Sequence, residues 1–179
     1  MSKIKTYRNY EHYMDRMFDP ESRENIVNSV KSFLEINPEI NAIACTGVSG
    51  ILGMHVSFLL HELVPYSFYI RKGSSHSTIK YIGTRPKYLR DLHYVIMDDL
   101  VDSGATVRRI VSSVAREYYS CPNINSEKLP KAIIVYDLDF FGFETEYKPH
   151  VTFKINPKTK HLVPIYPIDK HLNNKKIII

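Results

Sequence analysis

The sequence predicts an α/β fold in which a parallel sheet carries helices on both faces. Three observations lead to this prediction: short apolar runs alternate with segments of helical periodicity, Gly-containing loops follow apolar runs, and the 179 residues have the length of one domain. Parallel strands need long crossover connections, which the helical segments supply. We therefore expect a single domain over residues 1–179, with a core at about residues 19–136 and a smaller C-terminal appendage at about residues 137–179.

Composition excludes several classes of protein. With 44% hydrophobic and 24% charged residues, the chain has the mixture of a globular protein and not of a disordered or collagen-like one. No run approaches the ~20 apolar residues of a membrane helix, and residues 1–8 lack the apolar stretch of a secretory signal. Cys45 and Cys121 lie too far apart to suggest a zinc site or a disulfide framework. We expect a cytoplasmic protein with reduced thiols and no membrane partner.

The formal net charge of +5 suggests an anionic partner. Charge alone does not choose among nucleic acid, anionic lipid and phosphorylated metabolites. The basic residues are scattered and not striped, and no helix-turn-helix or RNA-binding signature is visible, so nucleic acid is not the expected partner.

The first expected helix follows Asp19, which suits an N-cap, and Pro20, which suits the first turn. Apolar residues at helical spacing give this helix one buried face: Ile26, Val27, Val30, Phe33 and Leu34. The Asn-Pro pair at residues 37–38 ends it. Residues 40–45 are expected to form a buried strand, followed by a Gly-containing loop and a helix over residues 54–63.

The rest of the chain continues the alternation up to residue 136. Three further strands are expected, at residues 64–70, 93–97 and 132–136. The polar residues 71–90 predict a long mobile loop, and residues 105–119 predict a helix whose apolar side carries Val107, Ile110, Val111 and Val114. The last forty residues contain four prolines and strand-like pieces such as residues 151–155, and we expect them to form the appendage on the sheet.

The segment between the third expected strand and the next helix contains candidate ligand-binding residues. In an open parallel sheet, ligands bind outside the carboxyl ends of the strands. Asp98 and Asp99 follow the apolar strand, and they suit the hydroxyls of a sugar or a magnesium ion. Four residues at the helix start offer successive backbone N–H groups and two hydroxyls to an anion: Ser103, Gly104, Ala105 and Thr106. Together they predict a phosphorylated sugar as ligand.

Simpler explanations exist for the individual acids. Asp98, Asp99 and Asp102 each also suit a turn or a helix cap. A generic doubly wound phosphate binder, such as a phospho-acceptor domain with paired aspartates, explains Asp98 and Asp99 but not residues 103–106.

Residues 94–106, Tyr-Val-Ile-Met-Asp-Asp-Leu-Val-Asp-Ser-Gly-Ala-Thr, resemble the phosphoribosyl-pyrophosphate (PRPP) signature of type I phosphoribosyltransferases. That signature is an apolar strand, two acids, two aliphatics and a loop ending in Thr/Ser-Gly-x-Thr. The resemblance implies that the 5′-phosphate of PRPP is bound by Asp102, Ser103, Gly104, Ala105 and Thr106. It also implies that Asp98 and Asp99 hold the ribose hydroxyls and Mg²⁺, the expected cofactor. Asp102 is then the catalytic residue that handles a proton at the base, and Asp98 and Asp99 offset positive charge on the sugar.

Two further segments resemble the pyrophosphate site of that family. Residues 45–50 occupy the place of its pyrophosphate loop, with Thr46, Gly47 and Val48 as the expected contacts. Arg71 and Lys72 resemble the basic residues that contact pyrophosphate, although a solvated loop edge is the alternative explanation. Residues 73–90 resemble the flexible loop that closes over the site, and residues 77–83 are similar to the lid of hypoxanthine-guanine phosphoribosyltransferases.

The expected base-binding region lies in the hood of this family, here residues 139–144, Asp-Phe-Phe-Gly-Phe-Glu. By that resemblance Phe140 stacks on the base and the backbone around Phe141 reads its edge, with core packing as the alternative role. Asp102 matches the acid of the 6-oxopurine enzymes. Those enzymes also carry a lysine at the end of the preceding strand, where this chain has Val-Tyr-Asp at residues 135–137. Recognition of a 6-oxo group therefore needs another donor, or the base differs.

The resemblance spans about residues 40–144 and implies an enzyme of purine salvage. Such an enzyme transfers ribose 5-phosphate from PRPP to a nucleobase (hypoxanthine, guanine or xanthine) and releases pyrophosphate. Type I enzymes are commonly dimers, so we expect a homodimer. The main alternative is a non-catalytic PRPP-sensing regulator or nucleic-acid-binding protein on the same fold. A PRPP synthetase shares the signature but needs two such domains, and this chain has the length of one.

Overall fold

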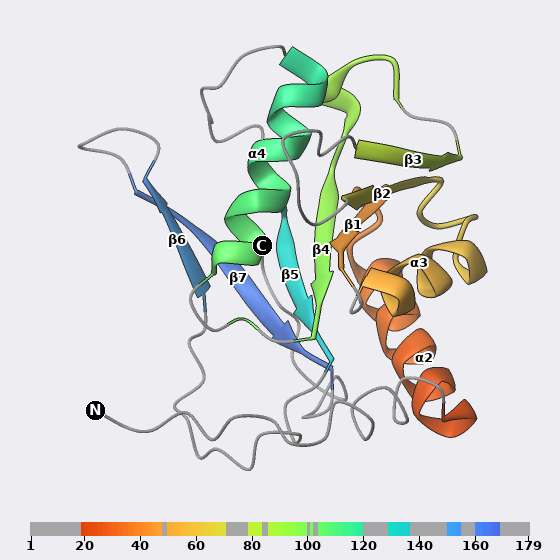
Figure 1. Ribbon diagram of the computed structural model, residues 1–179. Coiled ribbons are helices and arrows are strands. Elements are labelled where there is room, and N and C mark those ends of the chain that lie inside the picture. Colours follow the sequence, from red (N-terminus) through yellow and green to blue (C-terminus); the bar gives the residue numbers. More distant parts are fainter. Residues whose placement is uncertain are drawn as a thin grey trace, which may run out of the picture.

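The computed structural model describes residues 19–47, 50–70, 79–83, 86–99, 101, 104–119, 129–136, 150–154 and 160–168 (Figure 1). The described helices are α2 (Pro20–Ile36), α3 (Gly50–Leu59) and α4 (Ala105–Tyr119), and a 3-10 turn, η1, lies at Leu89–Asp91. The described strands are β1 (Ala42–Thr46), β2 (Tyr66–Ile70), β3 (Ile79–Gly83), β4 (Tyr94–Asp98), β5 (Ala132–Val135), β6 (His150–Lys154) and β7 (Lys160–Pro167). None of these helices is long and apolar enough to cross a membrane.

The strands form one seven-stranded sheet in the order β3-β2-β1-β4-β5-β7-β6. The five inner strands are parallel, whereas β3 pairs antiparallel with β2 at one edge and β6 pairs antiparallel with β7 at the other. Counted along the chain, the parallel strands have the order 2-1-3-4-5, as in flavodoxin-like doubly wound sheets. The strand order reverses between β1 and β4, which makes this the switch point of the sheet.

Helices cover both faces of the sheet, as predicted. Alternate strand residues point to opposite faces, so Ile43 on β1 packs in the core that includes α2 and α3, whereas the adjacent Ala44 packs in the core that includes α4. All five residues of β1 and of β4 are buried. Strands that are buried on both faces are mostly apolar and do not alternate between apolar and polar residues. Figure 1 shows α4 on one side of the sheet and α2 and α3 on the other.

Helix α2 follows its local sequence signals. Asp19 caps it by accepting a hydrogen bond of 2.7 Å from the Ser22 N–H, and Pro20 is in the first turn. This hydrogen bond lowers the pKa of the Asp19 carboxyl. At the other end the N–H of Asn37 donates to the carbonyls of Phe33 and Leu34. The predicted apolar face is confirmed, with Ile26, Val30, Phe33 and Leu34 buried.

The prediction of a continuous mobile loop over residues 71–90 is wrong for part of that segment. Residues 79–83 form β3, which pairs with every residue of β2, and residues 89–91 form η1. Without β3, the outer side of β2 would be an unpaired edge with exposed N–H and carbonyl groups. In the sequence, polar residues flank these five residues, so their β-branched and aromatic content did not predict a strand.

The sheet is also longer than the predicted core. Strand β7 pairs in parallel with β5, and its Val163 and Ile165 pack in the core below α4 while Tyr166 packs in the opposite core. The ring of Tyr166 lies 5.0 Å from that of Phe33 on α2, centroid to centroid. Residues 160–167 therefore continue the sheet beyond residue 136, although Pro164 and Pro167 within them are typical of irregular structure or strand ends.

Helix α3 starts at Gly50, four residues before its predicted start, and it ends at Leu59. Its glycines serve close packing. A Cβ atom on Gly53 would lie 3.0 Å from the Cβ of Cys45 and 3.3 Å from the Cβ of Met97. These two neighbours are fixed to the backbones of β1 and β4, so neither can move aside without moving its strand. Gly53 thus allows the helix to lie directly on the two strands at the switch point.

We predict that Gly53→Ala lowers the free energy of unfolding by about 1–2 kcal/mol, because overpacking outweighs the better helix propensity of alanine. Urea denaturation measures the change. Ser32→Ala on an exposed position of α2 is the control, and it should change stability by less than about 0.5 kcal/mol. A gain in stability for Gly53→Ala would show that the helix is not held against the strands.

Candidate functional site

The carboxyl ends of β1 and β4 define the candidate site. In the described residues β1 pairs with β2 along its whole length, up to Thr46 opposite Ile70, but it pairs with β4 only from Ala42 opposite Tyr94 to Ala44 opposite Ile96. Extending the second register by two residues places Thr46 level with Asp98. The last two residues of β1 and β4 thus have no ladder partner across the switch point, the position where ligands bind in such sheets.

A tight turn follows β1 and is fastened to β2. Gly47 has a φ of +69°, a conformation that glycine adopts without strain, and its carbonyl accepts the N–H of Gly50 at 3.1 Å. The hydroxyl of Tyr69 donates to the same carbonyl at 3.2 Å. Buried Thr46 donates its hydroxyl to the carbonyl of Ile70. The described part of the predicted pyrophosphate loop is therefore held by two side-chain hydrogen bonds to β2.

Tyr69 is a residue whose role the sequence analysis did not predict. Besides its hydrogen bond to Gly47, its ring lies against the start of α3, where a Cβ atom on Gly50 would be 3.1 Å from Cε2 of Tyr69. The one sequence signal is an aromatic residue at the carboxyl end of a strand, which is too common to identify such a contact.

Two acids end β4. Asp98 is the last residue of the strand and is only 3% exposed, whereas Asp99 is half-buried and its N–H donates to Oδ1 of Asp98 at 3.2 Å. Cys45 lies next to this pair: burial and, secondarily, the charge of Asp98 raise the pKa of its thiol to about 12. The thiol donates to the Gly50 carbonyl at 3.2 Å. Asp98 thus lies on β4 within electrostatic reach of β1.

The start of α4 completes the described part of the site. Gly104 is buried with a φ of +71°, and its carbonyl accepts the N–H of Arg108 at 2.9 Å. Ala105 is exposed and Thr106 is half-buried. The first turn of α4 contains no acidic residue, so the partial positive charge of the helix N-terminus is not offset from within that turn.

The structure brings seven of the predicted site residues to one edge of the sheet: Thr46, Gly47, Asp98, Asp99, Gly104, Ala105 and Thr106. The remaining predicted contacts lie outside the described residues: Val48, Arg71, Lys72, Asp102, Ser103, Phe140 and Phe141. Their roles stay predictions.

The donor set at the end of β4 fits magnesium bound in part by a ligand. Within the described ranges no group of three or more His, Cys, Asp or Glu side chains could hold a metal ion. Mg²⁺ is commonly held by one or two carboxylates, with waters and substrate phosphates completing its shell. Adjacent Asp98 and Asp99, one of them half-buried, match that arrangement.

We predict that Tyr69→Phe loosens the turn after β1 while leaving the fold intact. The variant keeps the ring against Gly50 but loses the hydrogen bond to Gly47, a net contribution of about 0.5–1.5 kcal/mol. Hydrogen exchange of the Gly50 amide, which donates to Gly47, should accelerate by roughly 2–10-fold. Tyr66→Phe on the same strand is the matched control. Equal exchange in the wild-type chain and in Tyr69→Phe would contradict the contact.

The pKa of Cys45 predicts a loss of stability at high pH. Its pKa rises from 9.0 to about 12 on folding, so the folded state favours the neutral thiol. The resulting stabilisation is complete below pH 9 and is lost as the pH rises from 9 to 12. Urea unfolding across this range, with a reductant present, should give a steeper decline for the wild-type chain than for Cys45→Ala. Parallel curves would show that the thiol is not desolvated.

Comparisons with known proteins give a weak likeness. No protein family model matches the chain, and no curated protein matches it. The orotate phosphoribosyltransferase from Aeropyrum pernix is similar in structure with a TM-score of 0.38 and 16% identity, over 58% of this chain and 56% of that one. The purine phosphoribosyltransferase from Pyrococcus horikoshii has a TM-score of 0.33 and 18% identity, over 64% of this chain and 72% of that one. The chain thus spans little more than half the length of the orotate enzyme, and similarity at this level assigns no activity to it.

Proposed function

We propose that this chain is a Mg²⁺-dependent phosphoribosyltransferase that moves ribose 5-phosphate from PRPP to a nucleobase and releases pyrophosphate. One observation carries the proposal. Residues 94–106, which resemble the PRPP signature, begin in β4 and end in the first turn of α4. The end of β4 lies at the edge of the sheet where the strand order reverses. The described acids of this segment, Asp98 and Asp99, and its glycine, Gly104, therefore lie at the position where doubly wound sheets bind ligands.

The start of α4 suits the 5′-phosphate of PRPP. Gly104 has no Cβ and a left-handed conformation, so its backbone can approach a phosphate closely. The hydroxyl of Thr106 and the helix dipole favour the same anion. Asp102 and Ser103, which precede Gly104 in sequence, are the proposed further contacts.

The other end of PRPP is a pyrophosphate, and the turn after β1 suits it. Gly47 again presents backbone without a side chain, and Thr46 is tied to Ile70, the residue that directly precedes Arg71 and Lys72. Arg71 and Lys72, the proposed cations, thus follow in sequence a residue that is bonded to the turn. Neutralising the charge of the leaving group and excluding water are what this reaction needs.

Asp98 and Asp99 would hold the ribose hydroxyls and Mg²⁺ between these two anion sites. When bound, the metal supplies positive charge to the leaving pyrophosphate. The carboxylates of this chain would offset the positive charge that develops on the sugar, and Asp102 would hold the proton exchanged at the base nitrogen. Phe140 and Phe141 are the proposed contacts to the base, and the proposed base is a 6-oxopurine: hypoxanthine, guanine or xanthine.

A panel of bases tests the activity and its specificity. The full chain is mixed with PRPP, Mg²⁺ and, in turn, guanine, hypoxanthine, xanthine, adenine, orotate or nicotinate, and pyrophosphate release is measured. We expect release with at least one 6-oxopurine and none after chelation of the metal. Release with adenine or orotate alone would keep the transferase and reject the purine specificity. No release with any base would contradict phosphoribosyl transfer to these bases.

We predict that Asp102→Asn keeps PRPP binding but lowers turnover by roughly 10²–10⁴-fold, because asparagine retains the backbone N–H proposed to contact the phosphate and loses only the proton carrier. Calorimetry with PRPP and the pyrophosphate assay separate the two effects. Asp91→Asn, on an exposed residue of η1, is the matched control and should leave both unchanged. Unchanged turnover in Asp102→Asn would remove that residue from the mechanism.

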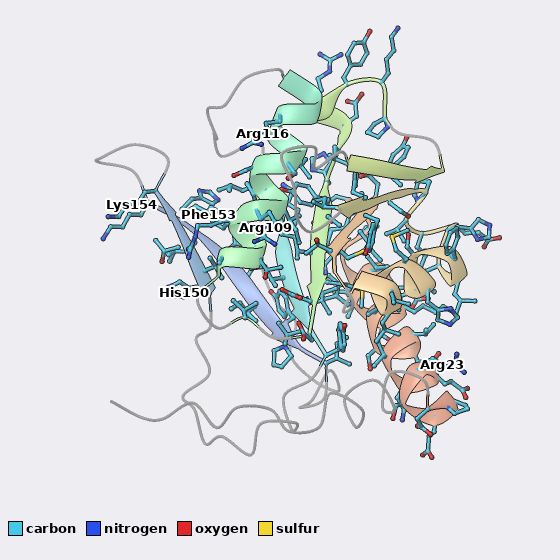
Figure 2. All side chains as sticks on the ribbon, in the orientation of Figure 1. Arg23, Arg109, Arg116, His150, Phe153 and Lys154 are labelled. Carbon is cyan, nitrogen blue, oxygen red and sulfur yellow. The ribbon has the colours of Figure 1, made fainter. Side chains whose placement is uncertain are left out.

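A second candidate function is a PRPP-sensing regulator that binds nucleic acid without catalysis. Arg109 and Arg116 favour it: both are exposed on α4, two turns apart, and Figure 2 shows them on that helix. Contacts to phosphates make such binding fall steeply with ionic strength. For such a regulator, binding of a labelled oligonucleotide should be weaker at 200 mM than at 50 mM salt, and weaker for Arg109→Ala than for wild type. Base-dependent pyrophosphate release occurs only in the enzyme, so the two assays separate the two functions.

A further inference from the structure

An arginine with no role predicted from the sequence lies beside Gly104 at the start of α4. A Cβ atom on Gly104 would lie 3.3 Å from Nη1 of Arg108 and 3.7 Å from its Cζ. The shorter of these distances is tighter than an ordinary van der Waals contact. Because glycine has no Cβ, residue 104 leaves room for the guanidinium group of Arg108 next to the backbone.

The geometry of α4 explains the position of Arg108. Its N–H donates to the carbonyl of Gly104 at 2.9 Å, so Arg108 lies one helical turn after Gly104. Side chains in an α-helix lean toward the amino end of the helix and cover the preceding turn. Arg108 therefore extends back over the start of α4, and it is an exposed residue that a ligand in solvent can reach.

The surroundings of this guanidinium also favour an anion. The first turn of α4 contains no acidic residue, so the partial positive charge of the helix N-terminus lies beside the full positive charge of Arg108. Val151 of β6 borders the same position, since its Cγ1 would lie 3.4 Å from the Cβ atom on Gly104. Val151 is buried and apolar, and charges attract one another more strongly where such groups replace water.

A guanidinium group recognises more than charge. It is planar and always protonated, and its N–H donors form a fork that matches two oxygens of a phosphate. A phosphate monoester carries a charge of about −1.5 to −2 at pH 7, more than the single charge of a carboxylate. The start of α4 with Arg108 beside it therefore suits a phosphate monoester better than a carboxylate or an uncharged sugar.

We propose that Arg108 is a further contact to the 5′-phosphate of PRPP, which it binds beside Gly104 and the hydroxyl of Thr106. This inference rests on the proposed function, because that function supplies the phosphorylated sugar. No bond of the 5′-phosphate forms or breaks in phosphoribosyl transfer. Arg108 is therefore a binding residue that sets the affinity for the sugar phosphate, and it takes no part in proton transfer.

Arg109 is the matched control for this contact. It has the same charge, is also exposed, and points about 100° farther around α4 than Arg108 does. Figure 2 labels Arg109 on this helix. A general attraction between a basic chain and anions would weaken equally on loss of either arginine. A direct contact would weaken only on loss of Arg108.

Calorimetry with the full chain and ribose 5-phosphate tests the proposal. We expect Arg108→Gln to raise the Kd for ribose 5-phosphate by roughly 10–100-fold, because it removes hydrogen bonds between charged groups. Arg108→Lys keeps the charge but loses the fork, so its Kd should rise by only about 3–10-fold. Arg109→Gln should change the Kd by less than about 3-fold, as expected for an exposed charge without a direct contact.

Three outcomes would overturn the proposal: a wild-type chain that does not bind ribose 5-phosphate at about 1 mM, equal binding by wild type and Arg108→Gln, or equal weakening by Arg108→Gln and Arg109→Gln. Circular dichroism checks that each variant is folded, as expected for exposed positions. Any of these outcomes together with pyrophosphate release in the base panel would reject the role of Arg108 and keep the proposed function. Binding that depends on Arg108, without pyrophosphate release for any base, would keep the sugar-phosphate contact and reject phosphoribosyl transfer.

Discussion

The close contact between α3 and the two strands at the switch point positions the rest of the candidate site. Gly53 lets the helix lie on Cys45 and Met97, and the Cys45 thiol donates to the carbonyl of Gly50, the first residue of the helix. The start of α3 is thereby fixed to β1. Since the turn after β1 leads directly into this helix, its geometry depends on a packing distance that only glycine permits, and not on the turn residues alone.

The two glycines with positive φ in the described residues lie on the two sides of the switch point. Gly47 follows β1, and Gly104 precedes α4 in the connection that leaves β4. Both place backbone without a side chain at the edge where the strands part, and the acids at the end of β4 separate them in sequence. One fold feature, the reversal of strand order, thus explains why polar backbone on both sides and carboxylates between them occur at one edge.

Local signals in the sequence predicted part of this structure, and contacts between distant residues decided the remainder. The span of α4, residues 105–119, and the cap at Asp19 were predictable because each depends on a few neighbouring residues. Strand β3 and the early start of α3 were not, because one forms by pairing with β2 and the other depends on close packing against β1. For the site, strand ends located the described residues, but the contact of Tyr69 with Gly47 joins positions 22 residues apart, and the local signal for it is too common to identify it.

The position of α3 links the packing of the sheet to the candidate site. One arc of the helix packs on β1 and β4, its first residue closes the turn at Gly47, and its opposite arc carries the exposed side chains of Phe58 and Leu59. Local openings are rarer where a segment is closely packed, so the packing of α3 on the sheet stabilises the turn that the proposed pyrophosphate contact requires. The placement of α3 and the order of the turn at Gly47 are then consequences of the same contact with the strands.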